Sequence, residues 1–495
     1  MLGFPIGDRP LLEILSKETI EEIHVASLRV LEETGIIVDS ENAFKIFIDM
    51  GADVDKDKKM VYIPEHLVKE ALKRTPSTVK LYGRNKKPSM ILSKNKVHYN
   101  PGSSALYMLD RKTGEMRRPL SKDFGEFVRL VDAMENIHAQ STSMVVSDVP
   151  EATADRYRLY IVLKNSTKPV VTGAFTIEGV HDMKKMLETV VGGEKELRKY
   201  PLAIFDVCPS SPLEWSEITA QNLIDCVNYG IPIEVITAPQ IGGTSPATLT
   251  GTLVQLNAEI LSGIVLAQMI KPGTPTVYGG SPCVLDMRTG TGRLAAIEAV
   301  MTCCAYAQMG KYYGLPTQGY LGISDAKIVD AQAGLEASMG LILGALAGIN
   351  NISGPGMLGS ENCQSFEKLV IDNEICGYAL RLIRGIQVNE ETLALDVIEK
   401  VGPGGHFLAQ KHTNEWFRLE EYMPSYVIDT RSERDWLERG AKDIVQRAKE
   451  RVDEILKEHE PEPLPPDVEK ELDSVVMEFM KKHGATKLPN FYYNV

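Results

Sequence analysis

A short polar segment of the chain gathers side chains that could do chemistry. Ser324, Asp325, Lys327 and Asp330 fall within seven residues, directly after the apolar run LPTQGYLGI. The apolar run predicts a buried strand, and the residues after Lys327 predict the start of a helix. Charged groups at the carboxyl end of a strand are typical of a site rather than a core. Asp325 is therefore a candidate catalytic residue, although it could equally cap the helix that follows.

Polar turns rich in Gly, Pro and Ser follow other predicted strands as well. These turns span residues 206–215, 238–246, 278–286, 322–327 and 354–362. Any one of them could be an ordinary chain reversal, because Gly and Pro are common in turns. Five such turns at strand ends favour a functional site on one rim of the fold.

The elements that must position these turns alternate regularly along the chain. Strands are predicted at 96–101, 138–147, 169–175, 202–208, 231–238, 274–280, 315–321 and 350–355. Helices are predicted at 121–135, 152–166, 177–191, 214–229, 248–270, 293–313, 327–349 and 362–385. Continuous apolar strands that alternate with helices indicate a parallel sheet covered on both faces. We predict a (β/α)₈ barrel, with a doubly wound open sheet as the alternative; the segment 96–118 could also be a hairpin.

Three regions follow from this pattern. We expect an N-terminal helical extension at 1–95, the barrel at 96–385 and a mostly helical C-terminal extension at 386–495. Long charged helices are expected near 432–458 and 466–484, separated by the proline-rich EHEPEPLPP.

Composition excludes several classes of protein. The net charge of −13 argues against binding to nucleic acid or to anionic lipid. The seven cysteines are scattered without a CxxC pair, so we expect a reducing cytoplasm and neither a disulfide framework nor a zinc ribbon. The N-terminus lacks the apolar core of a signal peptide, and the apolar run at 337–349 is too short to cross a membrane.

Eight segments, in order along most of the chain, carry a resemblance to a known family. They are VHYNPG, CPSSPLE, GGTSPATLTGTLVQLNAEILSG, YGLP, SDAKIVDAQAG, GPGML, LVIDNEI and GGHFLAQKHT. The chain thereby resembles the trimethylamine methyltransferase family. The resemblance implies a (β/α)₈ barrel that moves a methyl group from a methylated amine to the cobalt of a corrinoid. It also implies that a separate, cognate corrinoid protein carries this cofactor, so the enzyme itself holds none tightly.

One position departs from the family pattern. The archaeal trimethylamine enzymes carry pyrrolysine immediately before the Ser-Asp-Ala-Lys run, and this chain has Ile323 there. Pyrrolysine is thought to hold and activate small methylamines. With isoleucine in its place, we expect a substrate activated by its own fixed positive charge, a quaternary amine such as glycine betaine, proline betaine or carnitine.

The expected site follows from the chemistry of a quaternary ammonium, which has no N–H and is bound by aromatic faces and carboxylates. We expect the catalytic carboxylates to be Asp325, Glu214 and Glu259, which lies inside an apolar helix. The expected substrate contacts are His98, Tyr99, Asp206, Tyr278, Tyr320, Ile323 and Lys327, with Phe175, Trp215, Asp286 and Arg288 as further candidates. Each tyrosine could instead be core packing, Glu214 could cap a helix, and Glu259 could be held by a neighbouring polar group.

The expected contacts to the corrinoid lie in the glycine-rich turns that resemble the family: Gly354, Gly356 and His406. The pair His406 and His412 could suggest zinc, but no cysteine pair or HExxH helix accompanies it, so we expect no metal. By analogy of fold we also expect a homo-oligomer. The alternatives are a non-catalytic betaine-binding barrel, a metal-dependent barrel lyase or hydrolase, and a corrinoid methyltransferase for a non-amine donor.

Overall fold

Parallel strands lie at the centre of the molecule. The computed structural model describes residues 9–489 and 491. Within them, eight strands run parallel to their neighbours in two sheets, with the order β15-β13-β11-β10-β9 in one and β18-β19-β6 in the other. These strands are β6 (His98–Asn100), β9 (Gln140–Ser141), β10 (Val170–Thr172), β11 (Ala203–Val207), β13 (Ile233–Thr237), β15 (Thr276–Gly280), β18 (Gln318–Tyr320) and β19 (Asn351–Ser353). All eight lie inside the predicted strands, which confirms this part of the prediction.

The register of these strands decides which side chains meet inside the fold. Asp206 of β11 lies opposite Glu234 of β13, and Val235 lies opposite Tyr278 of β15. Because side chains alternate between the two faces of a strand, Asp206 and Glu234 point to the same face, and their neighbours point to the helices.

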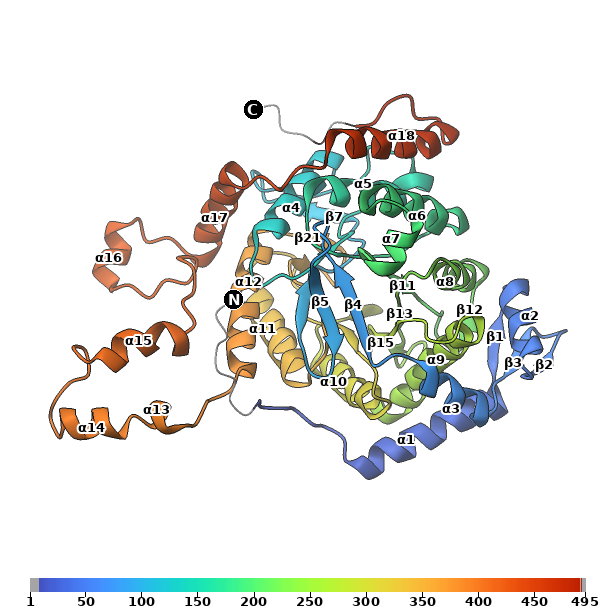
Figure 1. Ribbon diagram of the computed structural model, residues 1–495, viewed down its shortest axis with the longest axis horizontal. Helices are drawn as coiled ribbons and strands as arrows, with labels where there is room; N and C mark the ends of the chain where they lie inside the picture. Colours follow the sequence, from blue (N-terminus) through green and yellow to red (C-terminus); the bar gives the residue numbers. More distant parts are fainter. Residues whose placement is uncertain (1–8, 490, 492–495) are drawn as a thin grey trace.

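Helices follow the strands and surround them (Figure 1). They are α4 (Ser121–Ala133), α5 (Ala154–Asn165), α6 (Ile177–Val191), α8 (Glu217–Tyr229), α9 (Leu249–Ile270), α10 (Ile297–Tyr312), α11 (Ala331–Leu346) and α12 (Phe366–Ile383). This confirms the predicted helices, with shorter ends. Helix α11 begins at Ala331 and not near Lys327, because Asp330 is its N-cap and accepts a hydrogen bond from the Ala333 N–H at 3.1 Å.

A hairpin covers the amino ends of the central strands. It consists of β4 (Thr78–Tyr82) and β5 (Pro88–Ser93). Its inward residues Val79, Leu81, Met90 and Leu92 form a buried apolar cluster with strand residues Ala139, Val171, Ile204 and Val277. This end of the central strands is therefore closed by packed side chains.

The segment 96–118, for which the sequence allowed either a strand or a hairpin, forms both. After β6, the strands β7 (Tyr107–Leu109) and β8 (Met116–Arg117) pair as an antiparallel hairpin. They join β20 (Met357–Leu358) and β21 (Cys363–Gln364) in one sheet. A second accessory sheet contains β14 (Gln240–Ile241), β16 (Cys283–Asp286) and β17 (Thr291–Arg293). Both sheets are built from segments that follow central strands.

The sequence predicted a helical N-terminal extension, but the extension contains strands as well as helices. It contains α1 (Lys17–Arg29), the π-helical turn η1 (Val30–Thr34), α2 (Glu41–Asp49) and α3 (Glu65–Arg74). It also contains β1 (Ile36–Val38), β2 (Asp53–Asp55) and β3 (Met60–Tyr62), which form a sheet with β12 (Glu214–Trp215). The extension thus pairs with a turn that leads from β11 to α8, because Ile37 lies opposite Glu214.

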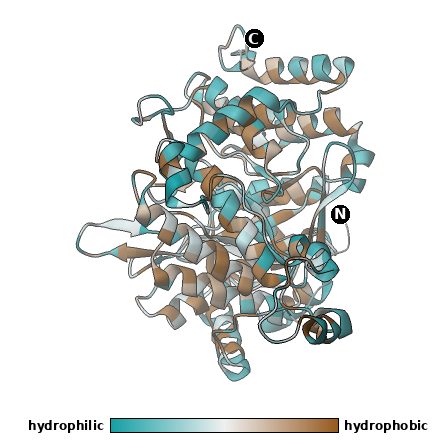
Figure 2. Cartoon of the chain, turned by 90° about the vertical axis from the view of Figure 1, so that its left-hand side faces the viewer, coloured by the Kyte–Doolittle hydropathy of each residue, from teal (hydrophilic) through white to brown (hydrophobic). Residues whose placement is uncertain are grey.

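The C-terminal region contains four short helices and two longer ones among the described residues. Short helices α13 (Glu390–Leu393), α14 (Leu395–Val401), α15 (Lys411–Glu420) and α16 (Glu433–Glu438) project from the body at the left of Figure 1. Helices α17 (Ile444–Glu458) and α18 (Pro466–Lys482) return to it, α17 against α12 and α18 against α6. The apolar and polar residues of α18 alternate along the helix beside the C-terminus label in Figure 2, and its apolar side, including Leu472 and Phe479, is buried.

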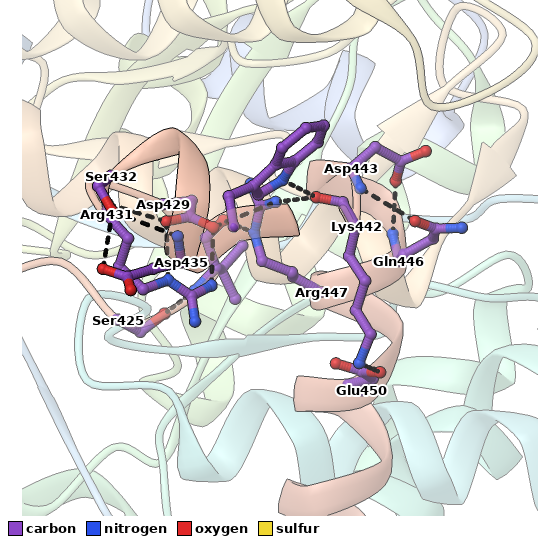
Figure 3. A network of polar contacts seen from close by, with 12 residues as sticks. Ser425, Asp429, Arg431, Ser432, Asp435, Lys442, Asp443, Gln446, Arg447 and Glu450 are labelled. Carbon is purple, nitrogen blue, oxygen red and sulfur yellow. Dashed lines mark hydrogen bonds and ion pairs between the residues drawn. The ribbon is translucent and has the colours of Figure 1, made fainter. Parts of the chain in front are cut away.

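The predicted single helix near 432–458 is wrong, because the chain breaks between α16 and α17. Gly440 and Ala441 both have positive φ, which a continuing helix does not allow. The break is held by polar contacts, shown in Figure 3: Arg447 donates to the carbonyl oxygen of Lys442, and Asp443 caps α17. Arg447 also donates to the carbonyl oxygen of Val427 at 2.9 Å.

Helix α9 is the central core helix. It is long and apolar enough to cross a membrane by composition, but 83% of its most apolar window is buried inside the protein. Its apolar surface is therefore satisfied by packing, and α9 contacts both α1 and α3 of the N-terminal extension.

We expect a Leu92→Ala substitution to lower the free energy of unfolding by about 2–5 kcal/mol, because it leaves a cavity under the hairpin where the native side chain is fully buried. Urea unfolding monitored by circular dichroism measures this. The exposed Lys80 on the same hairpin supplies the control, Lys80→Ala. Equal unfolding midpoints for Leu92→Ala and the control would show that the hairpin does not seal the core.

Candidate active site

A cavity of about 720 Å³ lies at the carboxyl ends of the central strands. Strands β11 and β18, helix α8 and the loops after β6, β10 and β20 supply its walls. Its lining residues are Ser103, Ser104, Leu106, Gly173, Ala174, Phe175, Asp206, Val207, Cys208, Ser216, Ile218, Thr219, Asn222, Tyr320, Ser360, Glu361 and Asn362. A second cavity, of about 620 Å³, lies between Arg129, Lys164 and Leu456 and contains no residue of a strand end. We therefore take the first cavity as the candidate site.

Two carboxyl groups on neighbouring strands form the floor of the site. Burial raises the pKa of Asp206 to about 7, although a hydrogen bond with Glu234 and the charge of Arg158 act in the opposite direction. Burial, together with the charge of Asp206, raises the pKa of Glu234 well above its ordinary value. Two close carboxylates cannot both ionise cheaply, so one proton is shared between them, held on Glu234.

Glu234 is held by a polar chain inside the fold. Its Oε1 accepts a hydrogen bond at 2.8 Å from Nδ2 of Asn351, and Oδ1 of Asn351 accepts one at 2.7 Å from Asn100. Asn100 also donates to Oγ of Ser353 at 2.8 Å. This chain fixes Glu234 in place, and Asp206, which lines the cavity, is the member of the pair that can meet a ligand.

A second acidic group stands in the loop opposite. Burial, and then the charge of Asp206, raises the pKa of Glu361 to about 8. Ser360 and Glu361 have φ angles of 56° and 74°, a left-handed conformation that is costly for two successive residues with side chains. Such strain is retained at sites where the surrounding structure imposes it, and here it places Glu361 at the cavity wall.

Aromatic rings and one buried cation complete the wall. Tyr320 Oη lies 3.4 Å from Oδ2 of Asp206. The guanidinium of Arg158 stacks at 4.5 Å from the ring centroid of Phe175 and donates to Oγ of Ser104 at 3.0 Å. Arg158 is only 1% exposed, so its charge lies behind the wall and offsets part of the negative charge of Asp206.

A buried ion pair anchors the loops after β18 and β19. Nζ of Lys368 lies 2.5 Å from Oδ2 of Asp372 and donates to the carbonyl oxygen of Gly322 at 3.0 Å. Oδ2 of Asp372 also accepts from the N–H of Gly356 at 2.6 Å. Gly354 is required in this loop, because a Cβ there would lie 2.2 Å from the Leu321 carbonyl oxygen. The pair therefore sets the position of both loops.

The polar segment singled out in the sequence lies beside the cavity. Oδ1 of Asp325 accepts hydrogen bonds from Oγ of Ser360 at 2.7 Å and from the Leu294 N–H at 3.2 Å, so it supports the Glu361 loop. Ile323 is 3% exposed and packs in an apolar cluster with Tyr320. Lys327 is exposed and donates to the carbonyl oxygen of its neighbour Asp325 at 2.6 Å.

Three of the expected substrate contacts lie elsewhere, which corrects the expected site. Tyr99 and Tyr278 point into the helix layer, where their hydroxyls donate to the Leu341 carbonyl oxygen at 3.3 Å and to Oδ1 of Asn257 at 2.8 Å. His98 lies at the amino end of β6, with Nε2 3.3 Å from the backbone of Ile91 in the hairpin. Alternation along the strand and the strand direction placed them there, which spacing alone did not reveal.

Other expected residues also have structural partners. Glu259 accepts hydrogen bonds from the Leu213 N–H at 3.0 Å and from Oγ of Ser211 at 2.8 Å, so it holds the turn after β11. The backbone of Glu214 pairs with the N-terminal sheet. His406 is exposed on the projecting segment between α14 and α15. None of these three lines the cavity.

Of the further candidates named from the sequence, one lines the cavity and the others have structural partners. Phe175 lines the cavity, whereas Trp215 is buried against Ser262, with Nε1 donating to its Oγ at 2.9 Å. Asp286 and Arg288 pair with each other at 2.6 Å. Among the described residues, no group of three or more His, Cys, Asp or Glu side chains is placed to hold a metal ion.

Sequence reasoning missed three residues of the site. Glu234 is a carboxylate inside the apolar run IPIEVITA, and Arg158 is a cation inside the fully buried helix α5. The charge of Glu234 within an apolar run is a recognisable signal, because such groups are seldom buried without a partner, whereas the sequence of α5 is itself polar and gave no such signal for Arg158. Glu361 stood within a noted turn, but nothing in its spacing indicated that it would face Asp206.

Comparison with known proteins gives a consistent picture. A sequence model of the trimethylamine methyltransferase family (MTTB) matches residues 3–484. A protein named trimethylamine methyltransferase MttB from Desulfitobacterium hafniense (strain DSM 10664 / DCB-2) is 35% identical over 475 residues, which cover 95% of each chain. A protein named glycine betaine methyltransferase from Desulfitobacterium hafniense (strain Y51) is 33% identical over 479 residues, 96% of this chain and 98% of that one.

Among solved structures, the fold is similar to that of MtmB in its hydroxylamine complex. The TM-score is 0.50 at 12% sequence identity, and the match covers 88% of this chain and 92% of the other. At that identity the likeness concerns the fold alone, a mixed α/β architecture with parallel strands.

We expect Asp206→Asn to gain stability relative to the wild type as the pH rises. The pKa of Asp206 is raised to about 7 in the folded protein, so the folded state holds a proton that the unfolded chain releases. The wild-type free energy of unfolding therefore falls between about pH 4 and about pH 7, and an amide has no such dependence. Urea unfolding across this range measures the difference between the two proteins.

Asp110→Asn is the control for this experiment. Arg117 holds the pKa of Asp110 below its ordinary value, so the wild-type advantage at that residue is already complete above about pH 4. A difference between Asp206→Asn and wild type that stays constant across the range would contradict a raised pKa at Asp206.

Proposed function

Because this chain belongs to the trimethylamine methyltransferase family, we propose that it transfers a methyl group from a quaternary amine to the cobalt(I) of a corrinoid carried by a separate protein. The observation that carries the proposal is the cavity at the strand ends, where Asp206 and Glu361 share a wall with Tyr320 and Phe175. Carboxylates and aromatic faces are the groups that bind an ammonium ion without N–H donors.

The proposed step is a displacement at the methyl carbon. The electron pair of cobalt(I) forms the new bond to carbon, and the C–N bonding pair stays on nitrogen. The leaving group is then a neutral tertiary amine, and the methyl acceptor becomes formally cobalt(III). No proton is needed, because the quaternary nitrogen already carries the positive charge that makes the amine a leaving group.

The surroundings of Ile323 support a quaternary substrate. Ile323 offers no acid and no covalent group, and it packs with Ala105, Ile236, Tyr320 and Met357 in an apolar cluster next to the cavity. An apolar surface suits the methyl groups of an ammonium ion. A free tertiary amine would need a proton donor to leave as a neutral molecule, and Ile323 cannot be one.

The carboxyl groups act mainly by binding and orientation. Positive charge leaves the nitrogen as the C–N bond breaks, so a strong carboxylate field would stabilise the substrate more than the transition state. The shared proton of Asp206 and Glu234 reduces this field, and the rigid wall holds the methyl group in line for attack. Asp206, Tyr320 and Glu361 are thus the proposed substrate-binding residues.

We also propose that the two parallel sheets form one closed (β/α)₈ barrel. Support comes from hydrogen bonds between their edges: the Tyr278 N–H donates to the Pro316 carbonyl oxygen at 2.9 Å, and the His138 N–H donates to the Tyr99 carbonyl oxygen at 2.8 Å. In such a barrel the carboxyl rim is the active face, and the corrinoid protein would dock over the cavity.

Several further expectations belong to this proposal. The glycine-rich loop with Gly354 and Gly356 borders the rim and is the proposed corrinoid contact. His406 stands away from the cavity on the projecting segment, so we assign it no role in catalysis. The enzyme is proposed to hold no corrinoid tightly itself, to work in the cytoplasm and to form a homo-oligomer.

The test is spectroscopic. The pure protein is mixed with reduced corrinoid, free or on a candidate partner protein, and with quaternary amines or trimethylamine one at a time. We expect loss of the cobalt(I) absorption band with a quaternary amine and no change with trimethylamine. We expect Asp206→Asn to slow the reaction by about tenfold or more, since it removes the charge that orients the ammonium.

Absence of conversion with every amine and every partner would overturn the methyltransferase proposal. Amine binding without methyl transfer would favour the binding-protein alternative. Activity that requires an added divalent metal, together with metal in the pure protein, would favour a metal-dependent barrel enzyme.

A further inference from the structure

Resting on the proposed function, we propose that the substrate is a quaternary ammonium whose remaining arm is uncharged and hydroxylated, as in choline, and not a carboxylate-bearing betaine. Three features of the cavity lead to this inference: the sign of the charge on its wall, the position of a buried cation and a buried acceptor without a partner.

The charge on the wall has one sign. Asp206 and Glu361 are the ionisable carboxyls among the described residues that line the cavity, and no lysine, arginine or histidine is among those residues. A betaine would bring its own carboxylate into a space of about 720 Å³ that already holds these two groups. Because no described lysine, arginine or histidine lines the cavity, a substrate carboxylate would lose its hydration there without gaining a cationic partner, which disfavours such a ligand.

A buried cation, Arg158, lies behind the wall and is engaged by protein groups. Arg158 is 1% exposed, and its Nη1 donates to Oγ of Ser104 at 3.0 Å and to the Thr142 carbonyl oxygen at 2.6 Å. The ring of Phe175 covers its guanidinium at 4.5 Å. Arg158 therefore lies behind the wall of the cavity, and its side chain is not among those that line it.

The buried amide of Asn222 has an acceptor without a hydrogen-bond partner among the described residues. Asn222 lines the cavity and is 4% exposed; its Nδ2 donates to the Ala174 carbonyl oxygen at 3.1 Å. That bond fixes the orientation of the amide, and Oδ1 of Asn222 is buried with no hydrogen-bond partner. An unpaired buried acceptor is costly, so it indicates a donor brought by the ligand. A hydroxyl can donate to it, whereas a carboxylate cannot.

The other polar side chains that line the cavity also suit a hydroxylated arm of the substrate. Hydroxyl side chains that line the cavity are Ser103, Ser104, Ser216, Thr219, Tyr320 and Ser360. Each can donate to or accept from a substrate hydroxyl, and none supplies a full positive charge. The trimethylammonium end then belongs beside Asp206 and Glu361, and the hydroxyl end beside Asn222.

Isothermal titration calorimetry with three probes tests the inference independently of methyl transfer. Choline and glycine betaine share a trimethylammonium group and differ in the arm, hydroxyl against carboxylate; tetramethylammonium has no arm. We expect choline to bind best, tetramethylammonium more weakly, and glycine betaine about tenfold or more below choline.

Variants locate the two ends of the ligand. Asn222→Ala should reduce choline binding to the level of tetramethylammonium and leave tetramethylammonium binding unchanged, which separates a lost hydroxyl contact from a general distortion of the site. Asp206→Asn and Glu361→Gln should weaken both cations. Glu399→Gln, on the exposed helix α14, removes the same charge far from the cavity and is the control.

Glycine betaine binding as tightly as choline, or more tightly, would overturn the inference, and so would no binding of any probe. Either result leaves methyl transfer to be judged by the cobalt assay. Conversely, choline binding of the expected rank with no transfer to cobalt would overturn the proposed function and support only the assignment of the ligand that the cavity binds.

Discussion

The burial of Asp206 beside Glu234 is the constraint on which the rest of the site depends. Parallel strands β11 and β13 bring these two residues into direct register, so their side chains must share one face of the sheet. Glu234 is fully buried and Asp206 reaches only the cavity. The pair is stabilised by a shared proton, by the hydrogen bond from Asn351 to Glu234 and by the charge of Arg158 behind the cavity wall. Such an arrangement is costly for folding, and its position at the strand ends is best explained by the ligand that it binds.

The scaffold around the pair limits how the site can move. The hairpin β4–β5 packs the amino end of the strands, and the buried pair Lys368–Asp372 holds the loops after β18 and β19. Glu259, which resembled a catalytic residue in the sequence, instead holds the turn after β11. Preorganised walls of this kind suit a reaction whose main requirement is a methyl group held in line with its acceptor.

Membership of a family does not by itself name a substrate. The relatives include proteins named for trimethylamine and for glycine betaine, at nearly the same identity to this chain. The substrate class must therefore be argued from the cavity. Its acidic wall, the shielded Arg158 and the unpaired Oδ1 of Asn222 favour a cation with a hydroxyl donor. In place of pyrrolysine, Ile323 adds an apolar surface and no chemistry of its own.

The sequence by itself determined the order of strands and helices, because apolar runs and helical periodicity are local properties of the chain. It also located the turns that carry Asp206 and Glu361 and the strand that carries Tyr320, and it revealed the family through motifs such as SDAKIVDAQAG. Only the tertiary structure decided which side chains enter the cavity. Tyr99, Tyr278 and Tyr320 look alike in sequence, but strand alternation sends the first two to the helix layer and the third to the site. The meeting of Asp206 with Glu234 and Glu361 required the strand register and a strained loop, and neither can be read from spacing, since both depend on contacts between distant parts of the chain.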